Sequence, residues 1–349
     1  MFLNHITLNQ FRCYAEPRTF TFSPEVTGIV GENARGKTSV LEAVYMISRG
    51  RGFREKEELE LLTFGAPHGE IAAQFLLGSE VQESAIAYAR QEERLQKKYF
   101  VNKAPIGHMK YVRAQPHVVL FAPHHIDIIV HGPSYRREYV DSVLASVDQA
   151  YAQALKVYEA TLRRRNALLE QYETMQTLEK DIVYWDDLLL RSAHTIQTAR
   201  AAYVAFMNTD PLCAGKTFRV QYLENTLNAH RLQELFPKEA AARRTLAGPQ
   251  KDDFSLSIKD ETSWRNVHMF ASRSQQRLSI LWLKMRELER FVSEGREPIL
   301  LLDDVYSEFD AANRRIITSI IPRFQTIITA TEEIELPTDI VRQMEVLRV

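Results

Sequence analysis

Short apolar segments separated by turns characterise the first hundred residues of the chain. The segments with the composition of β-strands are residues 20–22, 26–30, 70–77, 83–89 and 99–102. Residues 39–48 instead carry apolar side chains at helical spacing, directly after a loop that contains glycine. We therefore expect short strands around one helix in this part of the chain.

The pattern becomes helical after Pro133. Residues 135–207 contain neither glycine nor proline, and apolar positions recur three and four residues apart, which predicts two or three long helices. Gly248 and Pro249 then interrupt the chain. A further strand is expected at 254–258, a helix at 274–291, and buried parallel strands at 299–302 and 326–330.

This succession predicts an α/β protein whose main domain is split in sequence. Residues 1–130 and 246–349 are expected to contribute the two halves of one sheet. Residues 131–245 are expected to form a mainly helical lobe inserted between these halves. The length of 349 residues suffices for such a domain and its insertion.

Composition narrows the class of protein. Lys and Arg total 44 against 45 Asp and Glu, so binding to a polyanion would need a local basic patch. The cysteines are Cys13 and Cys213, far apart, which excludes a disulfide framework and a structural zinc site. The sequence contains neither a secretory signal nor an apolar run of about 18–20 residues, so we expect a cytoplasmic protein without a membrane span.

Residues 31–38 match the phosphate-binding motif G-x-x-x-x-G-K-[ST] in full. The residues expected to surround a bound nucleotide are Gly31, Glu32, Asn33, Ala34, Arg35, Gly36, Lys37, Thr38 and Ser39. Glycine lets the backbone wrap a phosphate group, and the N–H groups at the start of a helix attract its negative charge. Lys37 is expected on the β- and γ-phosphates of ATP, and Thr38 on Mg²⁺.

A pair of carboxylates follows the apolar segment 299–302. Asp303 and Asp304 are expected at the carboxyl edge of that strand, beside the phosphate loop. Asp303 would support the Mg²⁺ ion, and Asp304 would polarise the attacking water or accept its proton. A solvated Asp-Asp turn is the alternative, which the complete phosphate loop makes the less favoured one.

The order of the motifs indicates the class of ATPase. The acidic pair lies near the end of the chain, whereas nucleotide kinases and small GTPases carry it in the first part of theirs. A short element headed by Ser272 opens a helix shortly before the acidic strand. This is the layout of ABC-type ATPases, in which Ser272 and the helix N-terminus behind it would meet the γ-phosphate held by a second subunit.

With these motifs in this order, the chain resembles the RecF family, bacterial recombination mediators related to the SMC ATPases. The segments that carry the resemblance are residues 8–14, 51–54, 121–123, 132–141, 165–169, 248–253 and 301–310. The resemblance implies an ABC/SMC-type ATPase head, split in sequence, with an inserted helical lobe. It also implies that Arg12 and Gln275 contribute to the nucleotide site.

The function that the resemblance implies is an ATP-operated clamp on DNA in recombinational repair and replication-fork maintenance. Two copies would close on duplex, gapped or junction DNA when ATP binds, and weak DNA-dependent hydrolysis would reopen them. RecR and RecO are the implied partners in loading the recombinase. Basic residues that could contact backbone phosphates are Arg49, Arg51, Arg54, Lys56, Lys97, Lys98, Arg136, Arg137, Arg163, Arg164 and Arg165.

Several positions depart from the family pattern. Gln250 and Lys251 replace the usual His-Arg, and His124 and His125 replace an acidic pair. Ala34 and Ser274 stand where the family usually has glycine. The Cβ of Ser274 would hinder close approach of a partner's γ-phosphate, or its hydroxyl would donate a hydrogen bond to it. Two other functions therefore stay open. One is a nucleotide-gated scaffold with negligible hydrolysis, and the other is a RecF-like ATPase recruited to another role, such as phage defence, with a protein as its target.

Overall fold

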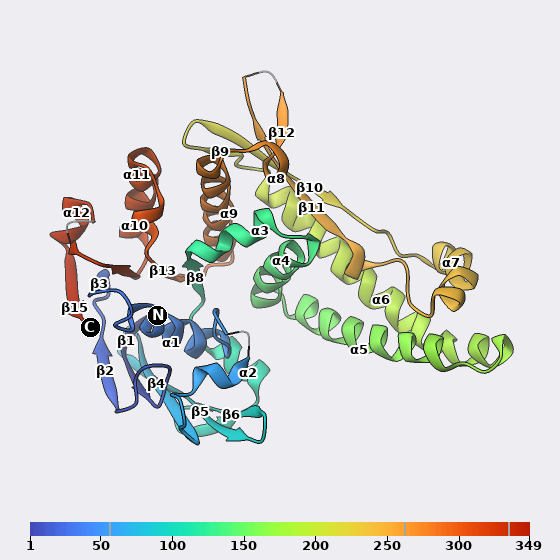
Figure 1. Cartoon of the computed structure of the whole chain (residues 1–349), viewed down its shortest axis with the longest axis horizontal. Helices are drawn as coiled ribbons and strands as arrows, with labels where there is room; N and C mark the ends of the chain where they lie inside the picture. The colour runs from blue at the N-terminus through green and yellow to red at the C-terminus, as the bar shows by residue number, and fades with distance from the viewer. Residues whose placement is uncertain (56, 262, 334–335) are drawn as a thin grey trace. The chain divides into compact units, whose positions relative to one another are not determined.

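The computed structural model describes residues 1–55, 57–261, 263–333 and 336–349 (Figure 1). The chain divides into two compact units. The first comprises residues 1–125 and 287–349, and the second comprises residues 126–286. Residues 246–286, which we had grouped with the C-terminal half of the main domain, lie within the second unit.

A parallel sheet forms the centre of the first unit. Its strands, within the described residues, run in the order β15 (Met344–Arg348), β3 (Val26–Val30), β14 (Thr326–Ala330), β13 (Ile299–Leu302) and β8 (Val118–Phe121). Every residue of β3, β8, β13 and β14 is buried, as expected for strands covered on both faces. The predicted strands at 26–30, 299–302 and 326–330 are thus confirmed, and the sheet joins the two halves of the split domain.

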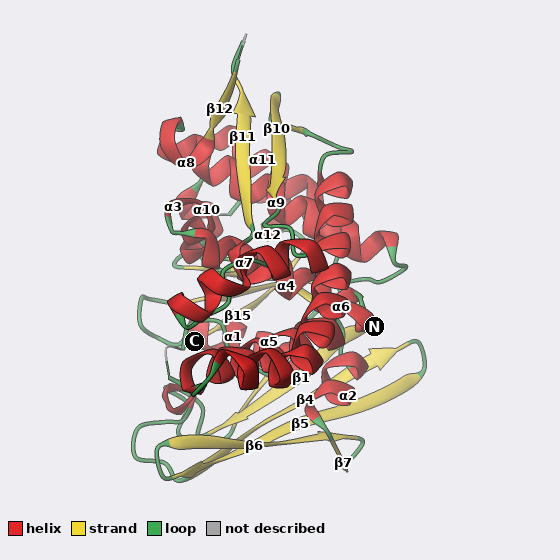
Figure 2. Cartoon of the chain, turned by 90° about the vertical axis from the view of Figure 1, so that its right-hand side faces the viewer, coloured by secondary structure: helices red, strands yellow, loops and turns green. Residues whose placement is uncertain are grey.

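The expectation of one sheet is wrong, because the N-terminal strands form a second, antiparallel sheet. Its order among the described residues is β2 (Arg18–Thr21), β1 (Phe2–Asn9), β4 (His68–Leu77), β5 (Glu80–Gln91), β6 (Arg94–Val101) and β7 (Ala104–Ile106). Figure 2 shows β4, β5 and β6 as long neighbouring strands. Tight turns with left-handed backbone at Gly78 and Glu92 join them, and a third at Asn102 joins β6 to β7. Such turns permit only antiparallel pairing.

Helices of the first unit cover these sheets and connect their strands. The bounds are α1 (Lys37–Arg49), α2 (His108–Ala114), α10 (Val305–Glu308), α11 (Ala311–Ile320) and α12 (Thr338–Val341). One buried cluster joins α1 to both sheets, with Val40 and Val44 of α1, Ile71 and Phe75 of the antiparallel sheet, and Leu301 of the parallel sheet among its members. This packing holds the start of α1 in place, directly after the end of β3.

The second unit combines long helices with a small sheet. Its helices are α3 (Asp127–Val130), α4 (Pro133–Val147), α5 (Gln149–Gln171), α6 (Met175–Met207), α7 (Ala229–Ala242) and α8 (Val267–Phe270), and α9 (Arg273–Ser293) begins here and ends in the first unit. The antiparallel strands are ordered β12 (Trp264–Asn266), β11 (Asp253–Lys259), β10 (Lys216–Leu223) and β9 (Leu212–Cys213). No helix in the described part of the chain is long and apolar enough to cross a membrane.

A buried ionic network holds the second unit together. The Arg200 guanidinium lies 2.7 Å from Oδ2 of Asp252 and 2.8 Å from Oδ1 of Asp141, and Arg200 and Asp252 are almost fully buried. Tyr222 donates a further hydrogen bond to Asp252. The acid-rich segment 248–253, one of the segments that carry the family resemblance, therefore has a structural role in this unit.

Candidate nucleotide-binding site

The phosphate loop follows β3 and ends in α1, so it lies at the carboxyl edge of the parallel sheet. Gly36 has φ +98, and a Cβ at this position would lie 2.7 Å from both Cys13 Sγ and the Tyr14 hydroxyl oxygen. Glycine is therefore required there for conformation and for space. Ala34 also has left-handed backbone, with φ +65, which is unfavourable for a residue with a Cβ.

Lys37 reaches back into this loop. Its Nζ donates to the carbonyl oxygen of Gly31 at 2.6 Å and to that of Glu32 at 3.1 Å, and the residue is buried. Arg35 points elsewhere and forms an exposed ion pair with Glu32 at 3.0 Å. The loop thus places one ammonium group among its own backbone groups, where an anion could bind.

Asp303, the first acid of the pair, contacts the start of α1. Thr38 Oγ1 donates to Asp303 Oδ1 at 2.9 Å, which joins residues 265 positions apart. Burial raises the pKa of Asp303 above its ordinary value. Hydrogen bonds from Thr38 and Thr329 act to lower this pKa, whereas the negative charge of Asp304 acts to raise it. The Thr38 hydroxyl and the Asp303 carboxylate are oxygen donors of the kind that Mg²⁺ prefers.

A second ionic cluster lies on the same helix. Glu42, one turn after Thr38, is fully buried and accepts hydrogen bonds from Arg12 Nε at 2.7 Å and Arg54 Nη2 at 2.9 Å. Arg54 also donates to Ser39 Oγ at 3.3 Å. Burial opposes ionisation of Glu42, but the hydrogen bonds and charges of Arg12 and Arg54 hold its pKa below the ordinary value.

A mainly apolar hollow of about 660 Å³ adjoins the phosphate loop. Arg12, Cys13, Leu62 and Phe64 are among its lining residues. Cys13 connects the hollow to the loop, because its Sγ lies 3.9 Å from Ser39 Oγ. The hollow could therefore take an apolar, planar group attached to a phosphate held by the loop.

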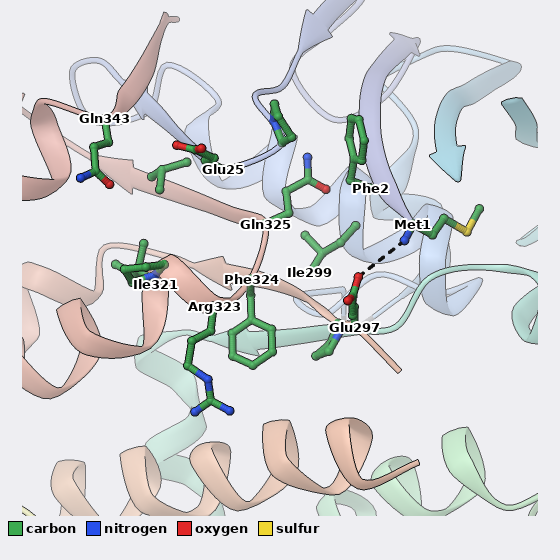
Figure 3. Close-up of a pocket in the computed structure, with 14 residues that line it drawn as sticks. Met1, Phe2, Glu25, Glu297, Ile299, Ile321, Arg323, Phe324, Gln325 and Gln343 are labelled. Atoms are coloured by element: carbon green, nitrogen blue, oxygen red, sulfur yellow. Dashed lines mark ion pairs between the residues drawn. The ribbon is translucent and has the colours of Figure 1, made fainter. Parts of the chain in front are cut away.

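Another hollow, of about 390 Å³, lies at the opposite edge of the parallel sheet (Figure 3). Val26 and Ile299, the first residues of β3 and β13, line it together with Phe324 and Gln325. Ligands of open α/β sheets bind outside the carboxyl ends of the strands, and this hollow lies at the amino ends. It is therefore separate from the phosphate loop.

The family model "RecF/RecN/SMC N terminal domain" matches residues 2–344 of the chain. The protein belongs to the RecF family. DNA replication and repair protein RecF of Lacticaseibacillus paracasei is 30% identical over 95% of this chain and 93% of its own length. The RecF protein of Gloeobacter violaceus is 32% identical over 95% and 92%, respectively.

Solved structures agree with this membership. A structure of the recombination mediator protein RecF with ATP, from the RecFOR pathway, matches with a TM-score of 0.84 at 27% identity. The match covers 95% of this chain and 94% of that one. An SMC head bound to the C-terminal winged-helix domain of ScpA shares the fold, with a TM-score of 0.57 at 14% identity. The predicted ABC/SMC-type head, split in sequence with an inserted lobe, is confirmed.

Ser272, which we expected to meet a partner's γ-phosphate, directly precedes α9 in the second unit. Its backbone N–H donates to Gln275 Oε1 at 2.9 Å, and its Oγ accepts from the Gln275 N–H at 3.3 Å. This reciprocal pair is a capping box, which satisfies N–H groups at the helix start. Ser272 and Ser274 are exposed, and Gln275 is half-buried.

The basic residues considered for DNA contact have different environments. Arg136 is ion-paired with Asp253 at 2.7 Å, and Arg137 donates to the backbone carbonyl of Asp252 at 2.8 Å. Arg54 binds Glu42, as described. Arg51 and Arg164 are exposed. Of the remaining candidates, Lys98 and Arg163 are exposed, and Lys56 lies outside the described residues. Lys97 pairs with Glu58, and Arg49 donates to the backbone carbonyl of Val118. Arg165 is fully buried and pairs with Asp186 and Glu239.

Glu42 and Thr329 were not predicted from the sequence. Glu42 could have been noticed, since it is the one acid within the apolar stretch 40–47, four residues after Thr38. Thr329 had no such signal, because threonine is an ordinary residue in a buried strand. Both were found only through the side chains that they contact.

Proposed function

We propose that this protein is an ATP-dependent DNA-binding protein of DNA replication and recombinational repair. The observation that carries the proposal is the contact of Thr38 with Asp303, 2.9 Å apart, next to a complete phosphate loop. Its relatives, which match along nearly all of their length, are DNA replication and repair proteins. In the cell, the protein would act in the cytoplasm, at the nucleoid.

The nucleotide would be held by the phosphate loop. Lys37 would move its ammonium group from the carbonyl oxygens of Gly31 and Glu32 to the β- and γ-phosphates. Mg²⁺, bound through Thr38 and supported by Asp303, would neutralise phosphate charge. Asp304 would orient the attacking water or accept its proton, and the hollow lined by Leu62 and Phe64 would receive the nucleoside.

ATP would also join two copies of the chain. The exposed Ser272, at the N-terminus of α9, would approach the γ-phosphate bound by the other copy. The closed dimer would hold DNA through backbone contacts, for which the exposed Arg51 and Arg164 are the foremost candidates. RecR and RecO would act with it, as the RecFOR pathway of the solved relative suggests.

The first experiment measures anisotropy of a labelled gapped duplex with Mg²⁺ and either ATP or ADP. We expect tight binding with ATP only, and at least a tenfold loss in Lys37→Ala, because the loop loses its cation. Lys103→Ala is the matched control, since Lys103 is an exposed lysine of the first unit that pairs with Glu83 at 3.7 Å and belongs to neither the phosphate loop nor the candidate DNA contacts. It should bind like the wild type.

The alternatives give different results in the same assay. Equal DNA binding with ATP and with ADP would favour the scaffold function over the ATP-operated clamp. Failure to bind DNA at moderate salt, together with intact ATP binding, would point to a protein target instead.

A further inference from the structure

The Thr329 hydroxyl contacts both acidic residues of the nucleotide site. Its Oγ1 accepts the backbone N–H of Asp304 at 2.9 Å and donates to Asp303 Oδ1 at 3.0 Å. The same oxygen is 3.4 Å from Asp304 Oδ1. Thr329 is almost fully buried in β14, which pairs with β13, the strand that ends before Asp303.

The backbone explains why such a contact matters here. Asp304 has φ +48, a left-handed conformation that an L-residue seldom adopts without support. The Thr329 hydroxyl accepts the Asp304 N–H, so it stabilises this turn at the end of β13.

The Asp303 side chain is held from two sides. Thr38 and Thr329 both donate to its Oδ1, at 2.9 and 3.0 Å. Thr38 comes from α1 and Thr329 from β14, so the carboxylate is fixed between the phosphate loop and the neighbouring strand. A carboxylate held in this way is preorganised to support a metal ion.

We propose that Thr329 is a positioning residue, which orients Asp303 toward the metal and holds Asp304 in the conformation used for water activation. This inference rests on the proposed ATP-dependent function. Thr329 itself would not touch the nucleotide. Its loss should therefore affect metal binding and turnover more than nucleotide affinity.

The test compares Thr329→Val, which removes the hydroxyl at nearly constant volume, with Thr329→Ser, which keeps it. The matched control is Thr326→Val. Thr326 is a fully buried residue of the same strand, and the partners of its hydroxyl within the described part of the chain are the carbonyl oxygens of Phe324 and Ile321. Each variant is assayed for ATP turnover, for binding of a fluorescent ADP, and for Mn²⁺ affinity by electron paramagnetic resonance with ADP present.

Loss of a residue that orients a metal ligand costs about 10- to 100-fold in metal affinity or activity. We expect Thr329→Val to lose at least about tenfold in kcat and to bind Mn²⁺ more weakly, with KM nearly unchanged. Thr329→Ser should recover most of the loss. Thr326→Val should lose thermal stability but keep its turnover and its Mn²⁺ affinity.

Three results would overturn the inference. Thr329→Val could bind Mn²⁺ and turn over like the wild type. Thr329→Ser could be as impaired as Thr329→Val, which would assign the effect to packing of the methyl group. Failure of the wild-type protein to bind ADP would instead overturn the proposed function, and this inference with it.

Discussion

Arg12 and Glu42 form a two-point ion pair beside the phosphate loop, with Nε–Oε2 at 2.7 Å and Nη2–Oε1 at 2.8 Å. The Glu42 side chain is inaccessible to solvent, and Arg12 has left-handed backbone with φ +52. The pair therefore fixes a strained residue of the N-terminal segment to the helix that follows the loop.

Glu42→Gln should destabilise the first unit. The substitution leaves Arg12 and Arg54 with a neutral partner at a buried position, and we expect a loss of about 2 kcal/mol in the free energy of unfolding. Urea unfolding measures this free energy. Glu60→Gln is the control, since Glu60 is 43% exposed and 3.5 Å from Arg12. Equal losses in the two variants would contradict a special role for Glu42.

His117 should make stability depend on pH. Burial, together with the charges of Arg49 and Arg296, lowers the pKa of His117 to about 3. The unfolded chain then binds a proton below about pH 6.5 that the folded protein does not, so stability falls between pH 6.5 and pH 3. At pH 5 the loss due to this residue should reach about 2 kcal/mol.

His117→Gln tests this pH dependence, because glutamine has no titratable group. Urea midpoints at pH 7 and pH 5 are compared for both proteins. The variant should be less stable at pH 7, since it loses the ring contact with Phe291, but it should lose less on acidification. The same slope in both proteins would assign the acid sensitivity to other groups.

Ala34→Gly should stabilise the protein slightly. Glycine adopts the left-handed backbone of position 34 without a steric penalty, and the gain should be about 0.5–1 kcal/mol. Ala43→Gly, inside α1, should instead cost about 1 kcal/mol. Thermal unfolding compares the two. A loss at both positions would mean that the loop in solution does not keep its left-handed turn.

Asp252→Asn should destabilise the second unit. Asp252 is fully buried and lies 2.7 Å from Arg200 Nη1, so the change removes one of the two carboxylates, Asp252 and Asp141, that pair with the buried Arg200. We expect a cost of about 3 kcal/mol and faster proteolysis within residues 126–286. Asp187→Asn breaks only an exposed pair with Arg191, and should change stability by less than about 0.5 kcal/mol.

Ser272→Asp separates the capping of α9 by Ser272 from its proposed contact with a partner's γ-phosphate. Aspartate is a good N-cap, so α9 should keep its stability, whereas Ser272→Ala should lose about 1 kcal/mol. The added negative charge would repel a phosphate, so ATP-dependent dimerisation should be lost. Sedimentation velocity with and without ATP measures the fraction of dimer. A Ser272→Asp protein that still dimerises with ATP would show that the serine does not meet the γ-phosphate.

Local patterns were sufficient for much of the fold and for the centre of the site. The phosphate loop could be recognised because residues 31–38 are contiguous and each has a local backbone requirement. The parallel strands at 299–302 and 326–330 could be predicted since a strand buried on both faces is apolar throughout. The acids after 299–302 could be placed because they follow directly from the end of that strand.

Tertiary structure alone decided which distant side chains meet. Glu42 accepts hydrogen bonds from Arg12 and Arg54, and Thr329 contacts Asp303 and Asp304. The sequence around Glu42 and around Thr329 does not identify these partners. The separate antiparallel sheet and the Arg200–Asp252 pair were likewise decided by the tertiary structure alone. The sequence determined the residue types and the local backbone, but side-chain contacts form across elements only once packing of the cores has brought those elements together.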